Sequence, residues 1–133
     1  MKKLLILLFS ILISFNSYGN KVFFCNDELA TGFHYKNKKY SVTNFTPQRH
    51  TIKFNDDFSL LSGLDDSDWE CSDSYFSSTY NSISCISPYQ NGGSFSYHKI
   101  SKRYVFLYSS TDGYIDNNSP SDDFLSAGTC KDF

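Results

Sequence analysis

Three histidines, His34, His50 and His98, are the side chains best suited to general acid–base chemistry near neutral pH. They occur singly, and none stands in a spacing that pairs a histidine with a nucleophile, a carboxylate or a metal, such as H-E-x-x-H. A catalytic site would require a histidine and a carboxylate to converge in a cleft. The sequence therefore predicts that the protein is not an enzyme and has no catalytic residue.

The densest group of carboxylates is the stretch D-D-S-D-W-E from Asp65 to Glu70. Carboxylates spaced closely on a loop can bind Ca²⁺ through oxygen ligands. The stretch lacks the glycine and the distal glutamate of an EF-hand loop, so we expect a solvated loop, no metal site and no cofactor, while calcium binding stays open. Asp112, Asp116 and Asn117 form a weaker second cluster.

Four cysteines in a short exported chain are typical of a disulfide framework. None of them has the C-x-x-C spacing of a zinc site. Three pairings are possible. We favour Cys25–Cys130, which would join the first strand of the mature chain to the last, and Cys71–Cys85, which would close a local loop. The spacing alone does not fix this connectivity.

The chain begins with a segment typical of a secretory signal peptide. A short positive region is followed by the apolar run 4–13, which is too short to span a bilayer, and by small or polar residues up to Gly19. We predict cleavage before Asn20, a single domain over residues 20–133, no transmembrane segment after cleavage, and a secreted or periplasmic location. A retained amino-terminal anchor is the alternative.

The charge of the chain argues against nucleic acid as a partner. The precursor has 12 Lys and Arg residues against 14 Asp and Glu, and removal of Lys2 and Lys3 leaves 10 against 14, a net charge of −4. Proteins that bind nucleic acid or anionic membranes usually carry a basic patch. Lys36, Lys38 and Lys39 come closest to one, and we expect them at a solvated hairpin tip.

Short strands dominate the rest of the chain. Within residues 94–110, the first five alternate polar and aromatic side chains, a short polar turn follows, and 103–108 is a near-continuous β-branched and aromatic run, which predicts an antiparallel hairpin near the centre of a sheet. Similar segments are expected at 21–25, 30–35, 40–45, 50–54, 58–61 and 79–87, with a turn at 26–28 and a bulge or close approach at Gly32. The prediction is an all-β fold, a single antiparallel meander of seven to nine strands that is barrel-like, with a β-sandwich as the alternative.

Aromatic side chains are unusually frequent, with 13 Phe, 10 Tyr and 1 Trp, or 18% of the chain. They suit strands and can fill a core, or a surplus can line a barrel mouth or a binding face. Tyr75, Phe76, Tyr80 and Tyr89 lie in loop-like, serine-rich surroundings and are candidates for such a face. Trp69, between two acidic residues, is a candidate interface anchor.

Four short motifs carry a resemblance to a loose group of short, uncharacterised exported bacterial β-proteins that start with F-x-C and end with G-x-C. The motifs are Phe23-Phe24-Cys25, Gly32-Phe33-His34-Tyr35, Tyr104-Val105-Phe106 and Gly128-Thr129-Cys130. They extend over most of the mature chain. This resemblance implies a small β-protein and no particular activity.

The aromatic-x-Cys start and the late cysteine are also similar to those of the periplasmic inhibitors of c-type lysozyme, which are small eight-stranded barrels. That family carries an S-G-x-x-Y loop. Here Ser62-Gly63 is followed by Leu64, Asp65 and Asp66, so the tyrosine of the motif is missing. The similarity therefore implies the barrel frame more than the inhibitory activity.

These observations predict a small, monomeric, non-catalytic binding protein outside the cytoplasm. One version holds a small apolar ligand inside the barrel, and the other binds a protein partner as an interaction or inhibitor module of the cell envelope. An interior filled by the barrel's own side chains would argue against the first version. A uniformly polar surface would argue against the second.

Overall fold

The structure is a computed structural model that describes residues 19–73, 81–89, 92–109 and 121–133. The predicted signal peptide lies almost entirely outside these ranges. So do three of the four loop aromatics, Tyr75, Phe76 and Tyr80, and the second carboxylate cluster around Asp112 and Asp116.

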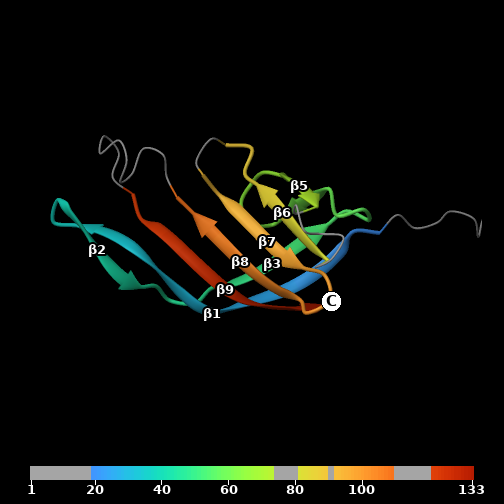
Figure 1. The fold of residues 1–133 in the computed structure, drawn as a ribbon, viewed down its shortest axis with the longest axis horizontal. Helices are drawn as coiled ribbons and strands as arrows, with labels where there is room; N and C mark the ends of the chain where they lie inside the picture. Colours follow the sequence, from blue (N-terminus) through green and yellow to red (C-terminus); the bar gives the residue numbers. More distant parts are fainter. Residues whose placement is uncertain (1–18, 74–80, 90–91, 110–120) are drawn as a thin grey trace, which may run out of the picture.

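Nine antiparallel strands form one sheet that closes on itself (Figure 1). They are β1 (Lys21–Lys36), β2 (Lys39–Asn44), β3 (Arg49–Phe54), β4 (Leu60–Ser62), β5 (Trp69–Asp73), β6 (Ser82–Ile86), β7 (Ser94–His98), β8 (Arg103–Tyr108) and β9 (Asp123–Asp132). Pairing of β9 with β1 closes eight strands into a barrel, and β2 is an additional strand beside β1. The all-β, barrel-like meander is confirmed. In the part of the chain described here, no helix is long and apolar enough to cross a membrane.

Strand β1 is long enough to pair with two strands, β3 and β2, along the same edge. Its first half pairs with β3 from Lys21 to Asn26, its second half pairs with β2 from Thr31 to Lys36, and β9 runs along the other side of both halves. The turn predicted at 26–28 is therefore wrong. The polar run instead forms a β-bulge at the register shift between Asp27 and Leu29, which bends the strand without ending it.

Gly32 lies at the close approach predicted from the sequence. A Cβ atom built on Gly32 would lie 2.0 Å from the carbonyl oxygen of Asp123 on β9. Any larger residue would therefore force β1 and β9 apart at this point.

Two disulfides connect directly paired residues of neighbouring strands. Cys25 of β1 is bonded to Cys130 of β9, and Cys71 of β5 is bonded to Cys85 of β6. Both predicted pairings are confirmed. The first bridge lies in the seam that closes the barrel, so the chain ends of the domain are joined where the sheet meets itself.

The barrel interior is packed with aromatic and aliphatic side chains. The buried apolar residues are Phe23, Cys25, Ile52, Phe54, Leu61, Trp69, Ile83, Cys85, Phe95, Tyr97, Tyr104, Phe106 and Cys130. Their rings contact one another in edge-on, tilted and stacked arrangements, such as Phe95 stacked on Tyr104 with centroids 5.2 Å apart. Seven of the aromatic residues noted in the sequence therefore belong to the core, and Phe58, Tyr108 and Phe124 pack against it.

Candidate functional site

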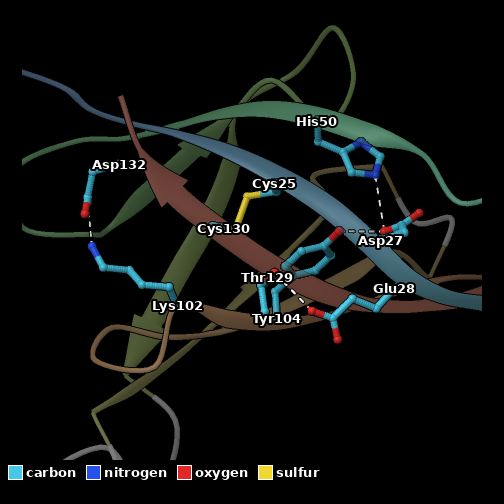
Figure 2. The surroundings of a disulfide bond; sticks show 9 residues. All are labelled: Cys25, Asp27, Glu28, His50, Lys102, Tyr104, Thr129, Cys130 and Asp132. Carbon is cyan, nitrogen blue, oxygen red and sulfur yellow. Dashed lines mark hydrogen bonds and ion pairs between the residues drawn. A yellow bond between two sulfur atoms is a disulfide. The ribbon is translucent and has the colours of Figure 1, made fainter.

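The side chain of Asp27, at the bulge of β1, is a buried carboxylate that is contacted by residues from other parts of the chain. The Asp27 side chain, 2% exposed, accepts a 2.6 Å hydrogen bond from the Tyr104 hydroxyl and a 2.8 Å hydrogen bond from the Gln48 amide. His50 points at the same carboxylate, with Nε2 3.7 Å from Oδ1 (Figure 2). Burial, followed by the hydrogen bond to Asp27, raises the pKa of Tyr104 well above its usual range.

His50 and Asp27 are thus a histidine and a carboxylate that meet, but they meet inside the core. His50 packs edge-on against Phe106 at a centroid distance of 6.0 Å. Its Nε2 is buried and makes no hydrogen bond within the described part of the chain. The contacts join β1, β3 and β8, so this group serves the packing of the barrel rather than an exposed reaction site.

The other two histidines lie at separate places. His34 Nδ1 is 2.8 Å from an Asp122 carboxylate oxygen, and the Tyr35 amide donates to the same carboxylate at 2.9 Å. Partial burial alone would raise the pKa of Asp122, but the bonds from Tyr35 and His34 outweigh it and lower that pKa. His98 accepts a 3.0 Å hydrogen bond from the Ser101 amide in the β7–β8 turn.

The acidic loop predicted at 65–70 is held by its first carboxylate. Asp65 accepts hydrogen bonds from the Ser67 amide and hydroxyl and from the Trp69 indole nitrogen, the last at 3.1 Å. Trp69 is 1% exposed, so its predicted role as an interface anchor is wrong. Within the described ranges no three His, Cys, Asp or Glu side chains are grouped as a metal site would require.

Three lysines cover one end of the barrel. Lys21 and Lys99 lie over the Phe58 ring, with Nζ 4.2 and 5.1 Å from its centroid, and Lys102 lies 4.7 Å from the centroid of Phe23. The protein supplies each ammonium with an oxygen of its own: the Asp56 carbonyl for Lys21, the Asp73 carboxylate for Lys99 and the Asp132 carboxylate for Lys102. At this end three ammonium groups therefore lie over aromatic rings that belong to the core or pack against it, and two of them, those of Lys99 and Lys102, are paired with carboxylates.

The outer surface of the barrel carries aliphatic side chains where water would favour polar ones. We call the group Leu29, Val105, Leu107, Leu125 and Ala127 the apolar face. Val105 pairs with Ala127, Leu107 pairs with Leu125, and Leu29 pairs with Ala127, so the five side chains adjoin one another across β8, β9 and β1. Leu29 is 71% exposed and Val105 is 45% exposed. A contiguous apolar patch of this kind is typical of an interaction surface.

A groove of about 430 Å³ runs over the part of the apolar face nearest the β7–β8 turn. Ser96, Val105 and Ala127 lie along it, while Leu29 and Glu28 at the bulge form one wall. The polar side chains that line it, besides Glu28 and the serines, include His98 and Arg103. The groove thus combines an aliphatic floor with charged margins, which is the usual composition of a peptide-binding surface.

Sequence reasoning did not find the apolar face. Of the four loop aromatics it singled out, Tyr89 is described and is 57% exposed. The signal that was available is the alternation Val105-x-Leu107 and Leu125-x-Ala127, in which both faces of a strand carry apolar residues. In an antiparallel barrel one of those two faces must be outside.

No family model matches this chain, and no match is found among curated proteins. Its function is therefore inferred from its own geometry.

Proposed function

We propose that this protein is an exported, non-catalytic binding module that docks a protein partner on the apolar face. The observation that carries the proposal is the contrast between a filled interior and an incompletely covered exterior. Leu29, Val105, Leu107 and Leu125 are each at least 40% exposed, although Phe95, Phe106 and other rings already fill the core. Burial of such side chains against a partner is favourable by roughly 25 cal/mol per Å² of apolar area.

The interior also bears on the two versions of the function expected from the sequence. A barrel that carries a small apolar ligand needs an open lumen. Here the lumen is occupied by Phe23, Phe54, Trp69, Tyr97 and their neighbours. The packed interior argues against an internal ligand and favours the protein-binding alternative.

The compartment belongs to the same proposal. Two disulfides in a small barrel support an oxidising environment, either the periplasm or the outside of the cell. Mass spectrometry of the exported protein is expected to give a chain that starts at Asn20 and carries both bridges. Sedimentation of that chain is expected to give a monomer. Free thiols in the exported protein would contradict the proposed compartment.

The experiment that tests the binding surface compares two lysine-bearing variants. Val105→Lys with Leu125→Lys places two charges in the middle of the apolar face, whereas Leu60→Lys places one on an exposed aliphatic residue of β4, 43% exposed and three strands away from β9 around the barrel. Both side chains on the face point outward, so the fold is retained, as circular dichroism would show.

Partners captured by the wild-type protein from the compartment that contains it are expected to be lost with the double variant and kept with Leu60→Lys. Retention of the same partners by the double variant would contradict docking on the apolar face.

A further inference from the structure

The groove on the apolar face has a positive side that the protein itself does not neutralise. Arg103 begins β8 and faces outward like Val105, two residues further along the strand. No carboxylate of the described residues forms an ion pair with Arg103, in contrast to Lys99 and Lys102. Its guanidinium can therefore pair with the carboxylate of a ligand, whose geometry fits the fork of N–H groups.

His98 supplies a second donor beside Arg103. The two residues flank the β7–β8 turn directly beyond the pair Tyr97 and Tyr104, and both line the groove. His98 Nδ1 accepts the Ser101 amide hydrogen, so the proton of the neutral ring is on Nε2. Nε2–H is therefore the hydrogen-bond donor that the ring can offer to a ligand.

The opposite side of the groove is acidic. Glu28 stands at the bulge of β1, two strands away from β8, which is about 10 Å at the usual strand spacing. Its carboxylate accepts a 3.1 Å hydrogen bond from the Thr129 hydroxyl on β9, which lies between the two walls (Figure 2). Between the walls the floor is aliphatic, with Val105 and Ala127 paired across β8 and β9. The groove is therefore polarised from Glu28 to Arg103.

We propose that this groove binds a segment of the partner protein in which an aliphatic side chain lies next to a carboxylate, with the carboxylate against Arg103 and His98 and the aliphatic group on Val105 and Ala127. The inference rests on the proposed function and specifies the chemistry of its partner. Glu28 sets the direction of the segment, because it repels a carboxylate placed on the β1 side.

The test uses N-acetyl-leucine, which joins an isobutyl group to a carboxylate, and its neutral twin N-acetyl-leucinamide. Each is titrated into isotopically labelled full-length mature protein to about 50 mM, the range suited to a ligand of this size. Saturable shifts of the amide and methyl signals of Leu29, Val105 and Ala127 are expected with the acid. The amide is expected to bind about tenfold more weakly, because it lacks the charge-assisted hydrogen bonds.

Three variants test whether the carboxylate of the ligand lies at Arg103 and away from Glu28. Arg103→Gln is expected to weaken N-acetyl-leucine about tenfold, and Glu28→Gln is expected to strengthen it. Lys53→Gln, which removes an exposed positive charge from the outer face of β3, is the matched control and is expected to change nothing.

Equal binding of the acid and the amide, equal effects of Arg103→Gln and Lys53→Gln, or the absence of saturable shifts would each overturn the carboxylate site. If partners are nonetheless lost with the Val105→Lys and Leu125→Lys variant, the proposed protein-binding function stands without this specificity. The two failures are thereby distinguishable.

Discussion

At the scale of single residues, two buried tyrosines show how differently one hydroxyl group can be accommodated. Tyr97 and Tyr104 are directly paired on β7 and β8, and burial raises the pKa of both. The Tyr104 hydroxyl donates to the buried Asp27 carboxylate, whereas the Tyr97 hydroxyl is buried without a hydrogen-bond partner in the described structure. The first hydroxyl therefore contributes to stability and the second does not.

This difference predicts opposite results for two matched substitutions. Tyr104→Phe is expected to lower the free energy of unfolding by about 2 kcal/mol, because it leaves Asp27 buried with one hydrogen-bond donor fewer. Tyr97→Phe removes an unsatisfied group and is expected to change that free energy by less than about 0.5 kcal/mol, or to raise it. Urea denaturation of both variants measures the difference, and equal losses would contradict the assigned role of Asp27.

Asp65 predicts a dependence on pH. Burial pushes the pKa of its carboxyl up, but the hydrogen bonds from Ser67 and Trp69 outweigh burial, and the pKa is lowered. A group whose pKa is lower in the folded state stabilises the fold above its unfolded pKa of about 4, and that contribution is lost as the pH falls through the folded value. The stability advantage of the wild type over Asp65→Asn is therefore expected to shrink below about pH 4.

Thermal unfolding followed by the fluorescence of the one tryptophan in the chain, Trp69, measures this advantage at each pH. A difference between wild type and Asp65→Asn that stays constant from neutral to acidic pH would contradict the role given to this carboxylate.

The buried position of Asp27 could not be predicted from the sequence. Asp27 stands in an N-D-E run that predicts a turn, and nothing local indicates that it faces inward. Its partners Gln48, His50 and Tyr104 come from other parts of the chain. A buried polar group can be recognised only when the strands that supply its partners are known to be neighbours.

At the scale of elements, the seam between β1 and β9 leaves no room for a side chain at its glycines. A Cβ atom on Gly128 would lie 2.0 Å from the Asn26 carbonyl oxygen and 2.8 Å from the Tyr104 hydroxyl. Gly128→Ala is therefore expected to cost at least about 2 kcal/mol, since backbone or core atoms must move. Ala127→Ser, the neighbouring change on the outer side, is expected to cost less than about 0.5 kcal/mol.

Chemical denaturation compares the two variants directly. A Gly128→Ala protein as stable as the wild type would show that β1 and β9 do not approach each other so closely at this point.

The strands were the part of the fold that the sequence predicted best. Alternation over 94–98, a polar turn and the apolar run 103–108 predicted the β7–β8 hairpin, with its turn in the right place, because a half-buried strand repeats every two residues. The continuity of β1 through Asn26 and Glu28 was missed, because a bulge and a turn have the same polar composition. What separates them is the long partner β9, which the local sequence does not show.

At the scale of the whole molecule, closure of the barrel was predictable because a disulfide joins residues that are far apart in the sequence. Cysteines near the two ends of the β-domain, read as a pair, place the first and last strands side by side. The apolar face had no such marker. Leu29, Val105 and Leu125 become neighbours only through the pairing of β1, β9 and β8, so they read separately as ordinary strand residues.

The two disulfides are expected to differ in their contribution to the stability of the closed barrel. Cys25 and Cys130 are separated by 105 residues, whereas Cys71 and Cys85 are separated by 14. A bridge that closes a longer loop removes more conformational freedom from the unfolded chain. Replacing Cys25 and Cys130 by alanine is therefore expected to cost about 4–5 kcal/mol, against about 3 kcal/mol for Cys71 and Cys85.

Urea denaturation of the two double-alanine variants measures both losses under one condition. The long-range bridge also lies in the β1–β9 seam, so its loss is expected to expose β9 amides to hydrogen exchange first, whereas loss of the short-range bridge exposes those of β5 and β6. If the Cys71 and Cys85 variant proved the less stable of the two, loop closure between the ends of the chain would not be what holds this barrel shut.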